Sequence, residues 1–324
     1  MLTYIIRRLL YSIVVLLVAS FLIFTFVTIS GDPLAFLKMS PGVDPATIAN
    51  IEARKHLNDP IVVQYFYWLK DAVTNQFGTT IIGERKIMPD IQRVMGHTLQ
   101  LVFFAEFLAI IIAIGVGVYS ALRQYSAFDY TATTFSFLGL ATPVFWLALM
   151  LQVLFVNIYL WFDIRIFYTA NLSGVDPGHG IHFAIDRAQH LALPIIVLCV
   201  ASIATYSRFM RGSMLEVINS DYVRTARAKG LPERSVIMRH AFRNALIPLT
   251  TVIALNFGAL IGGVVVTETV FGLDGMGLYF INSLNSGDPY PVMAWLMIVS
   301  AAIIFFNLLA DIAYGLLDPR VRHD

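Results

Sequence analysis

Long apolar segments alternate with shorter polar ones along the chain. An α-helix needs about 17 to 25 mainly apolar residues to cross the hydrocarbon core of a bilayer. Six segments reach that length, and most charged residues lie between them. The pattern predicts an all-α integral membrane protein with six transmembrane helices. These helices are predicted at residues 9–29, 98–122, 130–162, 191–207, 246–267 and 292–317.

The first apolar segment follows two basic residues, Arg7 and Arg8. This order resembles the basic and apolar regions of a signal peptide. The apolar run is longer than a typical signal-peptide core and lacks a small-x-small cleavage site before Gly31. We therefore predict a transmembrane helix within residues 1–30, with its N-terminus in the cytoplasm.

Residues 31–96 are polar and contain several turn-forming pairs, such as Asp59-Pro60. Within them, residues 59–69 have the apolar face of a short helix, and residues 77–80 indicate a turn. The alternative interpretation is an unstructured linker, but the aromatic content is too high for disorder. We predict a small extracytoplasmic insert after the first helix.

The segment 130–162 is free of charge and longer than one membrane span requires. Pro143 is expected to kink a single tilted helix there. The polar segment 163–190 is expected to form an outer loop. Its His179 and His182 could ligate a metal, but two histidines three apart without a third ligand are more typical of an exposed surface. No metal site is predicted.

Two acids and three glycines lie within predicted membrane helices. Glu106 and Asp311 are costly at membrane depth unless each faces a cavity or a polar partner. They could move protons or ions, or they could be structural acids, and both alternatives stay open. Gly258 and Gly262 lie four apart with Gly263 beside them, so this helix is predicted to pack closely against a neighbour or to line a pore.

The most basic part of the chain lies between the fourth and fifth predicted helices. Residues 208–243 hold eight Lys or Arg and three acidic residues. Basic loops of membrane proteins are typically cytoplasmic, and together with the other loops this one predicts that both chain ends are cytoplasmic. One interpretation is a loop that only sets topology. The order of its residues favours a more specific role.

A helix-turn-helix is predicted within this basic part. Gly230 is suited to the left-handed conformation that ends a helix, and a second helix is expected to start near Pro232 and run toward Pro248. Arg224 and Arg227 are expected to turn away from the apolar face of the first helix. That face is predicted to consist of Leu215, Ile218, Tyr222 and Ala226.

Composition excludes several classes of protein. Of 324 residues, 58% are hydrophobic and 13% charged, which excludes an ordinary soluble domain. The chain lacks a G-x-x-x-x-G-K-[ST] loop, so it is not an ATPase, and it lacks an H-E-x-x-H segment. It has no G-x-S-x-G segment at a strand-to-helix turn either, so no enzyme activity is predicted. No nucleic-acid partner is predicted. The single cysteine, Cys199, lies in an apolar run and is expected to be buried.

Residues 224–230, RTARAKG, resemble the cytoplasmic coupling loop of ABC importer permeases, in the form typical of the dipeptide, oligopeptide and nickel branch. In the wider family an E-A-A-x-x-x-G segment docks into a groove of the ATPase subunit. Arg224, Thr225 and Ala226 stand where E-A-A would be, and Gly230 stands at the glycine. The segments FGLDGMG at 271–277 and DPRVR at 318–322 also resemble this family.

The resemblance implies a type I importer permease for peptides or a related small solute. It implies a five-helix core over residues 97–317, a coupling loop at 208–245 and a cytoplasmic tail at 318–324. The implied partners are a second homologous permease, two ATPase subunits that bind ATP and Mg, and an extracytoplasmic solute-binding protein. No cofactor is expected on this chain, which would lie in the bacterial or archaeal cell (inner) membrane. The residues implied to contact the ATPase are Tyr222, Arg224, Thr225, Ala226, Gly230 and Pro232.

The alternative is a self-sufficient membrane protein, either an intramembrane hydrolase or a secondary transporter driven by ions through Glu106 and Asp311. A secondary carrier has no use for a docking helix. A chain without a nucleotide site needs one in order to receive work from ATP.

Overall fold

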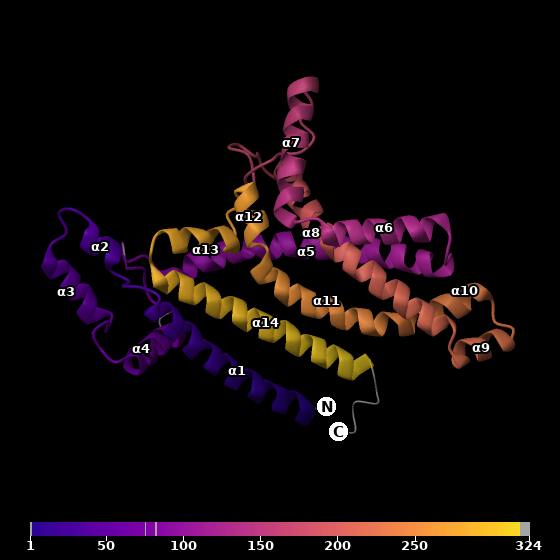
Figure 1. Ribbon diagram of the computed structural model, residues 1–324, viewed down its shortest axis with the longest axis horizontal. Helices are drawn as coiled ribbons and strands as arrows, with labels where there is room; N and C mark the ends of the chain where they lie inside the picture. The colour runs from indigo at the N-terminus through magenta and orange to yellow at the C-terminus, as the bar shows by residue number, and fades with distance from the viewer. Residues whose placement is uncertain (1, 75, 82, 318–324) are drawn as a thin grey trace. The chain divides into compact units, whose positions relative to one another are not determined.

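The computed structural model describes residues 2–74, 76–81 and 83–317 (Figure 1). These residues form helices and connecting segments, with a single isolated antiparallel bridge between Thr79 and Lys86. The chain divides into two compact units, one with residues 99–273 and 305–317 and the other with residues 2–98 and 274–304. The helices are α1 Leu2–Ile29, α2 Ala35–Met39, α3 Pro45–Arg54, α4 Ile61–Thr74, α5 Ile87–Leu122, α6 Ala127–Ala141, α7 Val144–Phe162, α8 Ile181–Ile218, α9 Asp221–Ala228, α10 Glu233–Ser235, the π-helix η1 Val236–Phe242, α11 Arg243–Gly263, α12 Val265–Phe271, α13 Met276–Asn285 and α14 Pro289–Leu317.

Six helical stretches of the described chain are long and apolar enough to cross a membrane. The prediction of an all-α protein with six candidate spans is therefore confirmed. Large apolar side chains such as Phe26, Phe135 and Leu160 remain exposed on the chain, as expected for surfaces that face lipid or a partner. The candidate spans are Ile6–Ile29, Ile87–Leu122, Val144–Phe162, Ile181–Ile218, Glu233–Gly262 and Pro289–Ile312.

The first unit is built around α8, against which α6, α7, α11 and α12 pack. Two glycines let neighbouring helices come close to it. A Cβ atom added at Gly117 of α5 would lie 2.7 Å from the backbone oxygen of Ser207, and one added at Gly139 of α6 would lie 3.1 Å from Val200 Cγ1. Tyr206 and Met210 of α8 are fully buried at the centre of this unit. Glycines on α5 and α6 thus allow these helices to pack closely against α8.

The single kinked helix expected at 130–162 is instead two helices, α6 and α7, and this prediction was wrong. The break lies at Thr142 and Pro143, both of which are extended, with ψ angles of 120° and 131°. Proline disfavours the helical conformation of the residue before it and has no N–H to donate to the preceding turn. Pro143 therefore separates two helices.

Helix α8 is longer at both ends than the predicted 191–207. The outer loop expected at 163–190 is helical from Ile181 onward, because the first turns of α8 pack on the preceding segment. His190 is buried, its ring stacks on Tyr168 at a centroid distance of 4.0 Å, and its Nδ1 lies 2.8 Å from the Asp186 oxygen. The segment between the predicted helices 246–267 and 292–317 likewise contains a helix, α13, which follows Gly272 in the left-handed conformation (φ 59°).

The second unit contains α1 to α4, the start of α5, α13 and the first part of α14. The helix expected at 59–69 is present as α4, which packs on α1. Tyr65 and Trp68 of α4 form a hydrophobic cluster with Phe24 and Met293, and the Tyr65 hydroxyl lies 2.8 Å from Ser20 Oγ. The turn expected at 77–80 is present, with positive φ angles at Phe77 and Gly78. Helix α5 begins at Ile87, whereas the corresponding helix was predicted to begin at residue 98. Its first turns therefore lie within residues 31–96, the predicted extracytoplasmic insert.

Candidate functional site

The basic part of the chain folds as a helix pair, and we name residues 221–242 the coupling segment. It consists of α9, a turn at Lys229–Pro232, α10 and η1. Gly230 has a φ of 76°, as the sequence predicts for a residue that ends a helix. An added Cβ at Gly230 would have no atom within 4 Å, so the constraint at this position is backbone conformation rather than space.

An ion pair closes the turn of the coupling segment. Arg227 donates to both carboxylate oxygens of Glu233, with distances of 2.8 Å from Nη2 and 3.3 Å from Nε. Hydrogen bonding to Glu233 raises the pKa of Arg227 above its usual value. Both side chains are exposed, so the pair stabilises the turn by at most about 1 kcal/mol. Its geometric effect is to fix α9 relative to α10 across the Gly230 turn.

The coupling segment has one buried and one exposed side. Val223 and Ala226 are buried, and α9 packs on η1, whose Val236 and Ala241 are also buried. Ala226 was predicted to lie on a face that meets the partner, and this is wrong because the chain covers Ala226 itself. The exposed side instead presents Tyr222, Arg224, Thr225, Leu231, Pro232 and Met238.

The apolar face predicted to run from Leu215 to Ala226 is also wrong, because the helix is interrupted. Helix α8 ends at Ile218, and Ser220 is extended with a ψ of 155° before α9 starts. Leu215 and Ile218 therefore belong to a different helix from Tyr222 and Ala226. A serine before an acidic first turn is a helix-start signal that could have shown this boundary.

The second helix of the pair starts after Pro232 and runs toward Pro248, as predicted. It continues through η1 into α11, which carries Pro248 in its interior and ends at Gly263. The coupling segment is therefore continuous with the fifth candidate span. A π-helical segment is rare and often occurs at functional sites, and no feature of the sequence predicted this one.

A buried ion pair that was not predicted lies just ahead of the coupling segment. Arg211 of α8 donates to Asp129 of α6 through Nε at 2.6 Å and Nη2 at 2.7 Å. The Asp129 side chain is 3% exposed and also accepts from the Tyr125 N–H. The Arg211 guanidinium holds the pKa of Asp129 at about 2. The only sequence signal was the Ser126-x-x-Asp129 spacing, which is typical of a helix start.

Glu106 lies in a buried network that joins α5, α8 and α11. Its carboxylate accepts hydrogen bonds from Ser202 Oγ at 2.8 Å and from the Tyr206 hydroxyl at 2.6 Å. Asn256 in turn donates to the Tyr206 hydroxyl at 2.7 Å. The hydrogen-bond donors around Glu106 in the described chain are thus neutral side chains. The arrangement is that of a structural acid satisfied by neighbouring helices.

The other predicted residues are more dispersed. Gly258 is buried and Gly262 half-buried on α11, while the packing of Gly263 at the end of that helix lies outside the described residues. Asp311 is half-buried on α14. Cys199 is buried and donates to the Ala105 oxygen at 3.0 Å, as expected of a packed thiol. The tail at 318–324 lies outside the described residues. Within the described chain no group of three His, Cys, Asp or Glu could hold a metal.

Comparison with known proteins extends over the whole chain. Residues 113–323 match the family model of the binding-protein-dependent transport system inner membrane component, and residues 1–84 match the N-terminal model of the same group. A solved structure described as an amino acid ABC transporter with histidines is similar with 16% identity and a TM-score of 0.47. It covers 72% of this chain and 94% of its own.

Curated relatives match from end to end. The oligopeptide transport system permease protein AppB of Bacillus subtilis is 41% identical, and the dipeptide transport system permease protein DppB of Alkalihalophilus pseudofirmus is 37% identical; both cover 100% of each chain. The oligopeptide permease protein OppB of Mycobacterium tuberculosis is 37% identical over 98% of each chain. Because the family model covers more than half of the residues and these relatives match along the full length, the chain belongs to the binding-protein-dependent inner membrane components, the permease subunits of ABC importers.

Proposed function

We propose that this permease carries peptides and forms half of the pathway of an ATP-driven importer. The observation that carries the proposal is the full-length similarity to three permeases named for oligopeptide or dipeptide transport. The other half of the pathway is a second, homologous permease. A solute-binding protein delivers the peptide from outside the cell membrane, and both ends of this chain lie in the cytoplasm.

Two separate ATPase subunits, which bind ATP and Mg, supply the energy in this proposal. The coupling segment is suited to receive one of them. Its exposed side combines apolar contact area at Tyr222, Leu231 and Met238, which are 46%, 39% and 53% exposed, with the charge of Arg224. Exposed apolar side chains rimmed by charge are typical of a protein interface.

The internal packing of the coupling segment favours transmission of force. Val223 and Ala226 fasten α9 to η1, and the Arg227–Glu233 pair fixes the turn at Gly230. A displacement of α9 is therefore expected to move η1 and α11, which form one continuous helix, as a rigid body. Helix α11 packs on α8, whose cytoplasmic half is tied to α6 through the Arg211–Asp129 pair. In this way a docked ATPase would reposition membrane helices without reshaping the segment it contacts.

The ion-coupled secondary transporter is not favoured. Glu106 is 1% exposed and is closed in by Ser202 and Tyr206, so an ion or proton carried through the protein would have poor access to it. Replacement of Glu106 by Gln is expected to lower thermal stability, because the amide NH₂ would face a hydroxyl donor. It is not expected to create or remove a dependence of uptake on an ion gradient.

Transport by the reconstituted system tests the proposal. The permease is co-purified with the second permease and the ATPases, placed in proteoliposomes with the binding protein, and supplied with ATP and labelled tri-alanine. Uptake is expected only with ATP and the binding protein, and this chain alone is expected to hydrolyse no ATP. Uptake of a nickel complex but not of peptides would overturn the substrate assignment, and peptide uptake driven by an ion gradient without ATP would overturn the coupling.

A further inference from the structure

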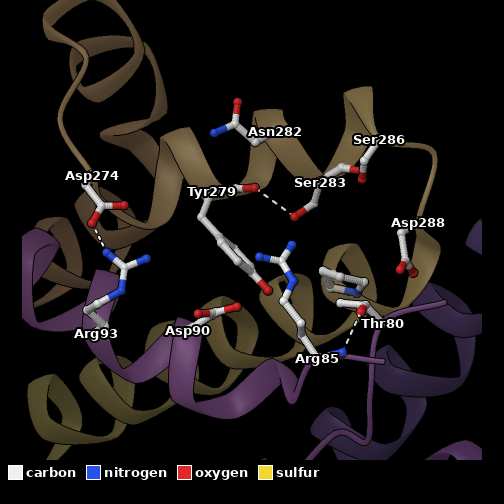
Figure 2. Close-up of a pocket in the computed structure, with 11 residues that line it drawn as sticks. Thr80, Arg85, Asp90, Arg93, Asp274, Tyr279, Asn282, Ser283, Ser286 and Asp288 are labelled. Atoms are coloured by element: carbon white, nitrogen blue, oxygen red, sulfur yellow. Dashed lines mark hydrogen bonds and ion pairs between the residues drawn. The ribbon is translucent and has the colours of Figure 1, made fainter. Parts of the chain in front are cut away.

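The second unit contains a cavity of about 370 Å³, lined mostly by residues of polar type, that the family assignment does not explain (Figure 2). Three parts of the chain supply its walls: the residues that flank the Thr79–Lys86 bridge (79–81 and 83–86), the first turns of α5, and the segment 274–291 that includes α13. The volume lies in the range of small-molecule sites. The charged and polar side chains that matter below are Arg85, Asp90, Arg93, Asp274, Tyr279 and Asp288.

The wall of the cavity that carries Arg85 is held in place by hydrogen bonds. The Arg85 N–H donates to Thr80 Oγ1 at 3.0 Å, and the Thr80 N–H donates to the Arg85 oxygen at 2.9 Å. Next to this bridge, the Ile81 N–H donates to buried Asp288 at 2.6 Å. The backbone of Arg85 is therefore fixed relative to the start of α14, whereas its guanidinium extends into the cavity (Figure 2).

Most of the charged side chains around the cavity already have ion-pair or hydrogen-bond partners within the protein. Arg93 pairs with Asp274, and His97 Nδ1 lies 2.6 Å from the Asp274 oxygen. Asp288 accepts from the N–H groups of Ile81 and Tyr290. These contacts join the segments that form the walls, so the cavity is part of the folded unit.

One cation and one anion are left over. In the described part of the chain, neither the Arg85 guanidinium nor the Asp90 carboxylate has an ion-pair or side-chain hydrogen-bond partner. The two groups lie on either side of the Tyr279 side chain, and both act electrostatically on its phenol (Figure 2). Burial raises the pKa of Tyr279 to about 12, so its hydroxyl stays protonated and can donate a hydrogen bond.

We propose that this cavity binds the charged ends of a short zwitterionic peptide, with the peptide carboxylate at Arg85 and the peptide ammonium at Asp90. The inference rests on the proposed function for the choice of peptide among zwitterions. A guanidinium is well suited to a carboxylate because it offers parallel N–H donors. An inorganic anion would pair with Arg85 alone and would be repelled by the Asp90 carboxylate, whereas a zwitterion can pair with both groups. Because both groups are reached by solvent, binding is expected to be weak.

The test uses the purified transporter complex without its binding protein, titrated with three probes and followed by saturation-transfer NMR. The probes are tri-alanine, N-acetyl-tri-alanine and tri-alanine amide. For the unaltered protein, each blocking group is expected to weaken binding by about 1.5-fold to fivefold, the scale of a solvent-exposed charge contact. Arg85→Gln should abolish discrimination against the amide, and Asp90→Asn should abolish discrimination against the acetylated peptide. Arg85→Lys should restore part of the first effect.

Two neighbouring substitutions serve as controls. Lys86→Gln and Glu84→Gln remove an exposed cation and an exposed anion from residues 83–86 without touching the cavity lining, so they should leave both discriminations unchanged. Equal binding of the three probes by the unaltered complex, or unchanged discrimination in both cavity variants, would overturn the proposal. If ATP-dependent tri-alanine uptake in proteoliposomes is normal in that case, the peptide-transport function stands and only this site fails. Absence of peptide uptake by the unaltered system would instead refute the function.

Discussion

Arg211 and Asp129 form a bidentate ion pair that links the C-terminal part of α8 to the start of α6, ten residues before the coupling segment. Asp129 is buried, so removal of one partner leaves the other desolvated and unpaired. Such losses cost about 1 to 3 kcal/mol. The pair therefore holds α6 and α8 together next to the coupling segment.

The first prediction concerns the pH dependence of this pair. The pKa of Asp129 is lowered from its ordinary value of 3.8 to about 2 in the folded protein. The stabilisation is therefore present in full above about pH 4 and is lost as the pH falls toward 2. Asp129→Asn should lower the melting temperature at neutral pH and flatten the loss of stability between pH 4 and pH 2. An unchanged acid profile in the variant, measured by thermal unfolding in detergent, would contradict this assignment.

The second prediction concerns Gly230. Because its backbone is left-handed and an added Cβ meets no atom, Gly230→Ala should cost about 1 kcal/mol through backbone strain alone. Gly230→Val should cost more. Both variants should insert normally and lose peptide-stimulated ATP hydrolysis in the assembled complex. Gly212→Ala is the matched control, since Gly212 is an exposed helical glycine with equally open space. Equal effects at the two positions would show that the turn geometry does not matter.

The third prediction separates the two sides of α9. Ala226→Glu places a carboxylate among Val223, Val236 and Ala241, so it should unfold the coupling segment itself and increase its proteolysis. Tyr222→Ala, on the exposed side, should leave protease resistance unchanged and weaken ATPase association. Limited proteolysis and pull-down of the ATPase on both variants make the comparison. Weaker association in Ala226→Glu with an intact segment would place Ala226 at the interface after all.

The fourth prediction concerns the contact between α5 and α8. Gly117→Ala would bring a methyl group to 2.7 Å from the Ser207 oxygen and Met210 Cβ, and is expected to cost about 1 to 3 kcal/mol from overpacking. Gly115→Ala, two residues away on the same helix, meets nothing within 4 Å and should be neutral or slightly stabilising. Melting temperatures of the two variants in detergent provide the test. Equal values would mean that α5 and α8 do not approach closely.

The fifth prediction concerns orientation in the membrane. In a Cys199→Ser background, a cysteine at Asp176 should react with a membrane-impermeant maleimide in intact cells. A cysteine at Thr225 should react only after permeabilisation, because the coupling segment is proposed to be cytoplasmic. Native Cys199 is buried and should stay unlabelled in both conditions. The reverse labelling pattern would invert the topology.

Hydrophobic length and backbone chemistry are local properties, and the sequence by itself determined what depends on them. Apolar runs near bilayer thickness predicted the spans, and Gly230 followed by Pro232 predicted a left-handed turn and a new helix. The segment RTARAKG was sufficient to indicate the family. Each of these signals acts within a few residues or one helix, so no knowledge of distant contacts was needed.

Only the tertiary structure decided which polar and small residues meet. The carboxylate of Glu106 could be assigned a structural role only because Ser202 and Tyr206, nearly a hundred residues away, donate to it. Likewise, Ala226 sits at a helical position that fits either side of α9, and its burial depends on η1 folding back over it. A helix pattern gives the direction of a side chain relative to its own axis, whereas the identity of the neighbour depends on how helices pack. That packing also decided that Arg85 and Asp90 share one cavity.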